Sequence, residues 1–326
     1  MKTRTARSAG TSVSNSAQVL EADSGQSVQI AGYSHIALVV GDLAAARKFY
    51  CDVMGFQALG TDMLADCGHH LTLTTASGQL VALCDSGASQ ALPETGNHQA
   101  FRVSPAARDE IVARLNKNDV TVHRYKEDRL AEQDDNFYAF DPFGNRLQLV
   151  ARGKSSGSSK FLIDGINHAA VQAIDVEWEE KFYLAHLGLP LDQVVGWRTS
   201  DYVRARLWGD GKEDMAPGAR RWDKRYNVMH GKDPVPRPNA QFYAKTGDGV
   251  LGVYLANNHY QAPPEEAVVG VRRLAFTVRR QDIDRLAERL ADWGPIVGPI
   301  KHPDSSPRSH SIYCKDPGAN FLEFCC

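Results

Sequence analysis

Two short stretches of the sequence share a spacing but differ in one residue that could do chemistry. The stretch "DPFGNRLQL" runs over Asp141–Leu149, and "DPGANFLEF" runs over Asp316–Phe324. At the eighth position the first stretch has Gln148 and the second has Glu323. An amide oxygen can bind a divalent metal ion, but only the carboxylate can also act as a general base. The two copies are therefore expected to differ in chemistry.

Histidines lie at matched positions ahead of these stretches. His35, in "YSHIALVVGDLAAARKFYCDVMGF", aligns without a gap with His168, in "GINHAAVQAIDVEWEEKFYLAHLGL". His98, in "NHQAFRV", aligns with Arg273, in "RRLAFTV". An imidazole can ligate a metal ion, whereas arginine is permanently charged, has no lone pair to offer and cannot. The second pair of positions therefore differs in chemistry as well.

These matches make the chain two copies of one unit. His35 and His168 are 133 residues apart, whereas Asp141 and Asp316 are 175 apart, so the second copy is longer by 42 residues. We place this insertion at about residues 198–240, where Gly, Pro and charged residues are dense.

Each copy repeats a finer pattern. A β-type run that opens on a histidine leads through a Gly-Asp turn into apolar residues at i, i+3 and i+4 spacing, which predicts a strand and then an amphipathic helix. The second half of copy one does the same, with Ser104 as the expected N-cap and Pro105 at the first helical position. Short alternating runs after each helix predict about three antiparallel strands. The chain therefore predicts four βαβββ modules.

The His-opened strands, the "KFY...GF" and "KFY...GL" helix endings and the two Asp-Pro strands resemble the vicinal oxygen chelate superfamily, from about Ile30 to Cys326. The resemblance implies an α+β fold in which four modules pair into two domains with half-open barrel sheets. The predicted organisation is a disordered tail over 1–28, domains at 29–152 and 163–326, and a "SSGSS"-containing linker over 153–162.

The resemblance also implies a divalent metal held inside paired modules by residues of their strands, and two imidazoles with a carboxylate suit Fe(II). The matching positions are His35, His98 and Gln148 in copy one, and His168, Arg273 and Glu323 in copy two. Neither copy has the complete set, because copy one lacks the carboxylate and copy two lacks an imidazole. We expect Arg273 to form a salt bridge with Glu323. Gln148 is either a weak third ligand or a polar core residue.

Module pairing is left open by the sequence. Modules one and two can pair, with three and four, or module one can pair with four and two with three, as in some hydroquinone dioxygenases of the superfamily. In the second arrangement His98 and Gln148 gain His168, and Arg273 and Glu323 gain His35. Either way one site has two imidazoles and an amide, and the other has an imidazole, an arginine and a carboxylate.

The resemblance implies a function as well. The leading prediction is a metal-dependent dioxygenase of the extradiol ring-cleavage type that acts on a small catechol or hydroquinone-like molecule, with Fe(II), or alternatively Mn(II) or another divalent ion. His310 and Tyr313 are the predicted catalytic residues, from their place in "SHSIY". The alternatives are a glyoxalase-like isomerase or lyase and a non-catalytic protein that sequesters a small molecule.

Composition limits the partners. The 326 residues carry a formal net charge of -2, so no basic field is expected to attract nucleic acid. No apolar run approaches the length of a membrane span. Six cysteines without framework spacing predict reduced thiols. A small-molecule substrate and a cytoplasmic location are expected, without a nucleic-acid or membrane partner, and a homo-oligomer is left open.

Overall fold

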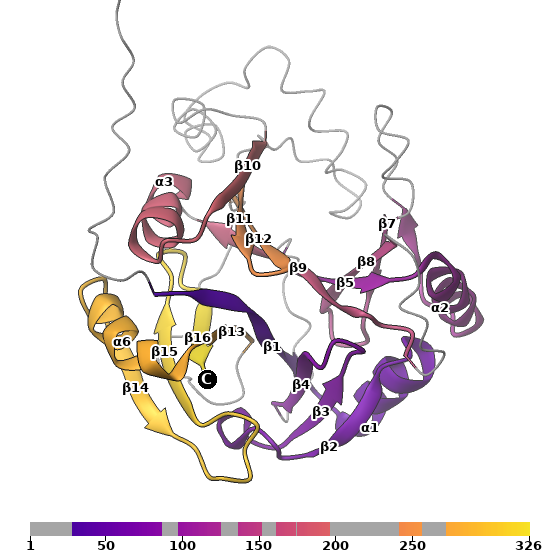
Figure 1. Ribbon diagram of the computed structural model, residues 1–326. Helices are drawn as coiled ribbons and strands as arrows, with labels where there is room; N and C mark the ends of the chain where they lie inside the picture. Colours follow the sequence, from indigo (N-terminus) through magenta and orange to yellow (C-terminus); the bar gives the residue numbers. More distant parts are fainter. Residues whose placement is uncertain are drawn as a thin grey trace, which may run out of the picture.

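The computed structural model places most of the repeated modules (Figure 1). The predicted tail up to residue 27, most of the predicted linker and the whole predicted insertion lie outside the described residues. The described residues are 28–86, 97–124, 136–151, 161–173, 175–195, 241–255 and 272–326.

The strands form two eight-stranded sheets. Sheet A has the order β14 (Ile296–Lys301), β15 (His310–Lys315), β16 (Phe321–Cys325), β13 (Arg273–Val278), β1 (Ile30–Val40), β4 (Leu80–Asp85), β3 (His70–Thr74) and β2 (Gln57–Thr61). Sheet B has the order β10 (Leu191–Val195), β11 (Gln241–Thr246), β12 (Gly249–Leu255), β9 (Gly165–Ala173), β5 (His98–Val103), β8 (Arg146–Ala151), β7 (Asn136–Phe140) and β6 (His123–Arg124).

The helical elements are short, apart from one of 13 residues in module two. They are α1 (Leu43–Arg47) with the π-helix η1 (Lys48–Val53), the 3-10 turn η2 (Ala65–Cys67), α2 (Pro105–Lys117), α3 (Val176–Glu180) with the π-helix η4 (Lys181–His186), the 3-10 turn η5 (Arg280–Asp282) and α6 (Ile283–Ala291). With the two sheets they confirm the predicted α+β fold of four βαβββ modules. None of the helices among the described residues is long and apolar enough to cross a membrane.

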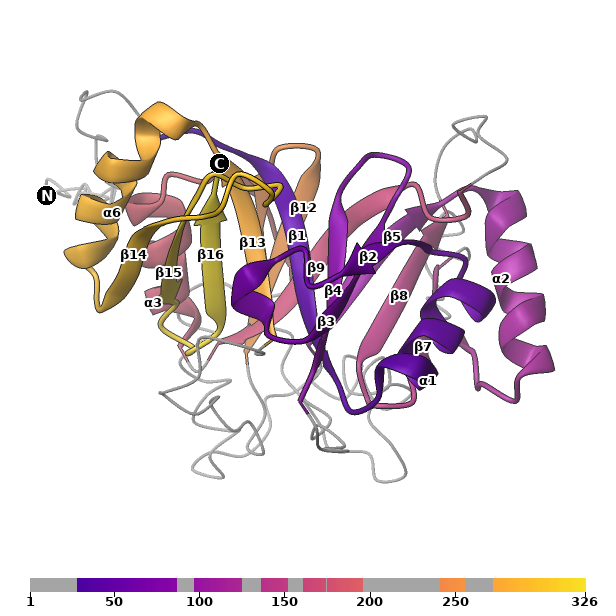
Figure 2. The same ribbon diagram turned by 90° about the horizontal axis from the view of Figure 1, so that it is seen from below.

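Each sheet takes one module from each half of the sequence. In sheet A, β1 pairs with β13 antiparallel, so module one joins module four, and the two strands lie side by side in Figure 2. In sheet B, β5 pairs with β9 antiparallel, so module two joins module three. This is the second of the two pairings left open by the sequence. The segments 29–152 and 163–326 therefore do not each form a sheet of their own.

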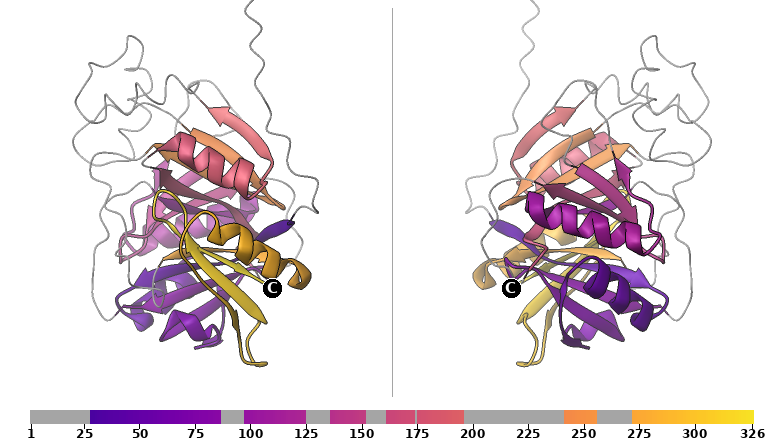
Figure 3. Two further views of the ribbon diagram at one scale, coloured as in Figure 1. Left: turned by 90° about the vertical axis from the view of Figure 1, so that its left-hand side faces the viewer. Right: turned by 90° about the vertical axis from the view of Figure 1, so that its right-hand side faces the viewer.

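The helices, in contrast, join modules of the same half. Figure 3 shows α1 beside α2 on one side of the molecule and α3 beside α6 on the other. Arg114 of α2 donates from Nη1 to the Asp52 carbonyl oxygen of η1 at 3.0 Å. On the other side, the rings of Phe182 and Trp293 pack with their centroids 5.3 Å apart. The sheets and the helices therefore tie the four modules into one body in different pairs.

The helix starts follow the sequence prediction. Ser104 accepts a hydrogen bond from the Ala107 amide at 3.1 Å, and Pro105 occupies the first turn, where its missing N–H costs nothing. Asp42 accepts from the Ala45 amide at 2.8 Å in the same way. These caps satisfy amides that have no partner within the helix.

The aspartates of the two Asp-Pro motifs are buried anchors. Tyr50, from the first "KFY" segment, donates its hydroxyl hydrogen to Asp141 Oδ2 at 2.9 Å. Tyr183, from the second, donates to Asp316 Oδ2 at 2.7 Å. Tyr50 belongs to a module of sheet A, and Asp141 belongs to a module of sheet B. In the second pair, Tyr183 belongs to a module of sheet B and Asp316 to a module of sheet A. The repeated Tyr and Asp residues thus bind the two sheets to each other.

Loss of either tyrosine hydroxyl is expected to destabilise the fold. Tyr50→Phe and Tyr183→Phe should each lower the free energy of unfolding by about 1.5–3 kcal/mol, because each removes a hydrogen bond from a buried carboxyl group. Urea denaturation of the two variants measures this loss. A loss below about 0.5 kcal/mol in both variants would contradict the anchoring role.

Candidate metal centre

Three of the predicted ligands lie on one face of sheet B. His168 of β9 is opposite Ala100 of β5, which in turn is opposite Gln148 of β8. His98 is two residues before Ala100 on the same strand, so its side chain points to the same face. We call this the site face of sheet B. The pairing of module two with module three thus brings His98, Gln148 and His168 together, as predicted for that pairing.

The two imidazoles face each other. Nε2 of His98 lies 3.1 Å from Nε2 of His168. Nδ1 of His168 lies 2.7 Å from Asn167 Oδ1, an acceptor, so Nδ1 carries the proton and Nε2 presents its lone pair. A metal-bound histidine commonly donates its other ring N–H to such an acceptor, which fixes the tautomer and orients the ring.

This geometry fits a divalent metal ion. Two nitrogen ligands that bind at about 2.1 Å and at a right angle to each other are about 3.0 Å apart, close to the spacing of the two Nε2 atoms. Gln148 is 5% exposed, and its Oε1 atom has no hydrogen-bond partner among the described residues. A buried acceptor without a donor costs free energy that a bound ion would recover. The three residues therefore form a neutral donor set.

The described residues around the trio are polar but include no acidic side chain on the site face. Tyr138 packs edge-on against His98, with the ring centroids 5.5 Å apart, and burial raises the pKa of its hydroxyl. The Arg146 guanidinium lies 4.7 Å from the centre of the Tyr138 ring. The site-face positions described on β5, β7, β8, β9 and β12 include no Asp or Glu. They are His98, Ala100, Arg102, Tyr138, Phe140, Arg146, Gln148, Val150, His168, Ala170, Gln172, Val250, Gly252 and Tyr254.

The Asn167 contact gives a testable expectation. Asn167→Leu keeps the volume of the side chain but removes the acceptor that orients His168, so metal affinity should fall about 10- to 100-fold. Asn97→Leu is the matched control, because Asn97 precedes His98 and accepts from the Tyr254 hydroxyl at 3.2 Å. Titration with a competing chelator compares the affinities. Equal affinity in wild type and Asn167→Leu would show that Asn167 does not position the ligand.

The equivalent face of sheet A carries the other predicted residues. His35 is opposite Ala275, which is opposite Glu323, and Arg273 lies two residues before Ala275. Glu323 Oε2 is 2.8 Å from Arg273 Nε and 3.1 Å from His35 Nε2. The predicted salt bridge between Arg273 and Glu323 is thus present, with His35 beside it.

Two further residues complete this arrangement. Arg308 donates from Nη1 to Glu323 Oε1 and from Nη2 to Asp66 Oδ1. Arg273 donates from Nη2 to Asp66 Oδ2 at 2.7 Å, and the Tyr313 hydroxyl donates to the same oxygen. Two guanidinium groups and two carboxylates therefore balance in charge. We call Asp66, Arg273, Arg308 and Glu323 the buried ion cluster.

The electrostatics of the cluster keep Glu323 ionised. Burial alone would raise the pKa of Glu323, but His35, whose Nε2 is 3.1 Å away, and the guanidinium groups of Arg273 and Arg308 hold it well below its usual range. Burial lowers the pKa of His35, against the attraction of Glu323, so this imidazole is neutral. Glu323 also accepts a hydrogen bond from the Ser311 hydroxyl at 2.7 Å.

The donor set of sheet A fits a metal ion poorly. His35, Glu323 and Cys325 offer ligand atoms within 4.8 Å of one another. Both oxygens of Glu323 are already bound by guanidinium groups, however, and a divalent ion would add two charges to a buried cluster that is neutral without it. Uncompensated buried charge is costly, so the fit favours sheet B.

The predicted catalytic residues both lie on sheet A. Tyr313 is opposite Glu323 and points to the face of the buried ion cluster. His310 is three positions earlier on β15, so it points to the opposite face, where its Nε2 is 3.4 Å from Arg280 Nη2. The structure does not bring either residue to the sheet B trio.

Sequence reasoning missed the partners of the predicted residues. Asp66 and Arg308 are 242 residues apart, and nothing in the local sequence of either marks the contact. Asn167 had a signal, because an amide directly before an aligned histidine can reach its ring.

Comparisons with known proteins agree with this fold. Residues 32–149 match the model of the Glyoxalase/Bleomycin resistance protein/Dioxygenase superfamily. No curated protein matches the chain significantly. A "putative dioxygenase from Bacillus subtilis subsp. subtilis str. 168" is similar in structure with a TM-score of 0.63 and 16% identity, over 92% of this chain and 86% of the other. Glyoxalase I from Zea mays gives a TM-score of 0.56 and 14% identity, over 90% of this chain and 92% of the other.

Proposed function

We propose that the chain is a member of the Glyoxalase/Bleomycin resistance protein/Dioxygenase superfamily, whose model matches residues 32–149, and that sheet B is the working site of a metal-dependent dioxygenase. His98, His168 and Gln148 would hold one divalent ion, Fe(II) or alternatively Mn(II). The substrate would be a small catechol or hydroquinone-like aromatic. The observation that carries the proposal is the pair of facing imidazoles, with their Nε2 atoms 3.1 Å apart, beside Gln148 Oε1, for which the described part of the chain supplies no hydrogen-bond donor.

The neutral donor set determines what such a site would bind. Without a carboxylate ligand, the two charges of the ion stay uncompensated, which favours a substrate with deprotonated vicinal oxygens. When bound, the ion would supply Lewis acidity and, if it is iron, redox chemistry with dioxygen. The module pairing seen in the two sheets is also the arrangement of some hydroquinone dioxygenases in the superfamily that the sequence resembles.

Residues around the trio would position the aromatic substrate. The raised pKa of Tyr138 keeps its hydroxyl protonated, so that it can donate a hydrogen bond to a substrate oxygen. The Arg146 guanidinium, 4.7 Å from the Tyr138 ring centre, adds positive charge to the site face. Gln172 is fully buried, and neither polar atom of its amide has a hydrogen-bond partner among the described residues. It can therefore bind a polar group of the substrate.

A proton-transfer reaction is the weaker candidate. An isomerase of the glyoxalase type needs a general base, and no Asp or Glu occupies the described site-face positions of β5, β7, β8, β9 and β12. Both histidines would be committed as ligands. The site face therefore favours oxidation over isomerisation.

The test is anaerobic reconstitution with Fe(II), followed by metal analysis and oxygen-uptake measurements with a panel of catechols and hydroquinones. We expect one metal ion per chain and oxygen consumption with at least one compound. Stoichiometric metal without oxygen uptake, but with isomerisation of a thiol adduct, would instead support the glyoxalase-like function. A protein that binds aromatic compounds but no metal would support sequestration and overturn both enzymatic functions.

A further inference from the structure

A buried cysteine, Cys84, lies on the face of sheet A that holds the buried ion cluster. It is two residues after Ala82 on β4, Ala82 is opposite Ala37 of β1, and Ala37 is opposite Arg273 of β13. Side chains two residues apart on a strand point to the same face, so Cys84 and Arg273 share one face of the sheet. The Cys84 thiol is fully buried there, and the proposed metal site of sheet B does not use it.

A second cysteine, Cys67, packs onto the same face. It ends the η2 turn, three residues before His70, which is opposite Cys84 on the neighbouring strand. Cys67 and Cys84 belong to one small buried cluster, whose other members are Ala37, Leu64 and Ala82. Interaction with the Cys84 thiol lowers the pKa of Cys67, and interaction with Cys67 raises the pKa of Cys84. The turn and the sheet thus bring two thiols together.

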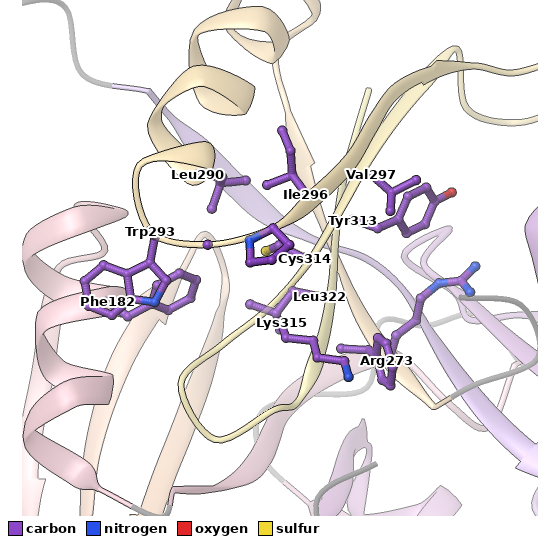
Figure 4. A pocket seen from close by; sticks show the side chains of 13 residues that line it. Phe182, Arg273, Leu290, Trp293, Ile296, Val297, Tyr313, Cys314, Lys315 and Leu322 are labelled. Atoms are coloured by element: carbon purple, nitrogen blue, oxygen red, sulfur yellow. The ribbon is translucent and has the colours of Figure 1, made fainter. Parts of the chain in front are cut away.

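Arg273 places a positive charge beside the Cys67 sulfur. Figure 4 shows the Arg273 side chain turned away from Phe182 and Trp293, and its guanidinium carbon is 5.6 Å from the centre of the Tyr313 ring. There Nη2 of Arg273 donates to Cys67 Sγ at 3.0 Å. A cation beside a thiol stabilises the thiolate, so Arg273 also contributes to the lowered pKa of Cys67.

Other cysteines of the chain have the opposite electrostatic character. Burial raises the pKa of Cys51, Cys314 and Cys325, so these thiols are protonated and react slowly. Cys67 combines a lowered pKa, an arginine donor and an adjacent thiol. These are the features of a cysteine that is oxidised to a disulfide.

We propose that Cys67 and Cys84 are a modification site at which a hydroperoxide forms a reversible disulfide. The Cys67 thiolate attacks hydrogen peroxide, the O–O bond breaks, and the sulfur becomes a sulfenic acid while hydroxide leaves and takes up a proton. The Cys84 sulfur then attacks Cys67 Sγ. The S–S bond forms, the S–O bond breaks, and the hydroxyl group leaves with the Cys84 proton as water. Two thiols and one hydrogen peroxide thus give one disulfide and two molecules of water.

The surface turn that contains Cys67 gives the peroxide access. Gly68 and His69, which follow Cys67, are exposed, and Asp66 before it is partly exposed. Local opening of this turn admits a molecule as small as hydrogen peroxide. The disulfide ties the turn to β4 and so holds Asp66 against Arg273. No residue of sheet B takes part, so the modification is independent of the proposed dioxygenase function.

Peptide mapping of the full-length protein after peroxide treatment tests this assignment. The protein is treated with hydrogen peroxide in the presence of a chelator, the remaining thiols are alkylated in urea, and the unreduced peptides are analysed by mass spectrometry. We expect a disulfide between Cys67 and Cys84, a loss of two of the six thiols, and recovery of all six with dithiothreitol. Cys51, which is partly exposed, should remain a thiol over the same time.

Cys84→Ser separates the two steps of the reaction. Without the second thiol, Cys67 should stop at the sulfenic acid, which dimedone labels. Cys51→Ser is the matched control and should form the disulfide as wild type does. Two results with wild type would overturn the proposal. One is recovery of Cys67 and Cys84 as thiols after treatment that oxidises Cys51, and the other is a disulfide that joins Cys67 to a different cysteine.

Discussion

His98→Ala protein, reconstituted with Fe(II), is expected to lose stoichiometric metal. The substitution leaves one imidazole and one amide on the site face of sheet B, and two neutral ligands hold a divalent ion poorly. Loss of an orienting partner alone typically costs 10- to 100-fold in affinity, so loss of a ligand should cost more than about a hundredfold. Metal analysis after gel filtration, with chelator competition to obtain the affinity, measures the effect.

His35→Ala is the control that distinguishes the two sheets. It removes the imidazole beside Glu323 on sheet A and leaves the sheet B trio intact, so it should keep the bound metal. The opposite result, with metal kept by His98→Ala and lost by His35→Ala, would place the ion between His35, Glu323 and Cys325. Circular dichroism on both variants shows that each remains folded.

The sequence predicted local structure and shared faces well. The internal repeat showed which strands of the two copies are equivalent. It also predicted that His98 and Gln148 face the same site, because both belong to module two, where their strands are neighbours. The caps at Ser104 and Pro105 were also predictable, because they depend on residues three or fewer positions apart. Patterns of this kind act over one turn or one strand.

Module pairing could not be predicted, because it depends on contacts between distant segments. His98 lies beside His168 if β5 pairs with β9, and beside His35 if β5 pairs with β1. The strand sequences permit both pairings, and the structure shows the first. Asp66 was missed for the same reason. It lies in a short turn of module one and meets Arg273 and Arg308 only because module four packs beside it.

The charges explain why one copy keeps a carboxylate and the other an amide. On sheet A, Arg273 and Arg308 surround Glu323, so an amide there would leave a buried positive charge. On sheet B the position of Arg273 is taken by His98, which can be neutral, so Gln148 creates no such imbalance. The arginine and the carboxylate therefore belong together, as do the imidazole and the amide.

Glu323→Gln is expected to lower the free energy of unfolding by about 3–5 kcal/mol, because two buried guanidinium groups would share the single carboxylate of Asp66. Glu288→Gln, on the exposed face of α6, is the matched control and should change stability by less than about 0.5 kcal/mol. Urea denaturation at pH 7 compares the variants. A loss below about 1 kcal/mol for Glu323→Gln would show that the cluster contributes little to stability.

Acid should also lower the free energy of unfolding of the wild type, because it protonates the carboxylates of the buried ion cluster. The pKa of Glu323 is well below its ordinary value of 4.5 in the folded chain, so its contribution is complete above pH 4.5 and is lost as the pH falls further. Asp66, whose pKa is also lowered, acts in the same direction. Between pH 5 and 3, wild type should therefore lose more stability than Glu323→Gln, which has already lost one of the two carboxylates.

A double variant separates charge balance from packing. Arg308→Met added to Glu323→Gln leaves one guanidinium, Arg273, facing one carboxylate, Asp66, and should recover part of the lost stability. Recovery would show that the imbalance of buried charge, rather than a missing contact, causes the loss. If the two losses simply add, the cluster stabilises the fold through its individual hydrogen bonds, and sheet A would then tolerate a change in net charge such as a metal ion brings.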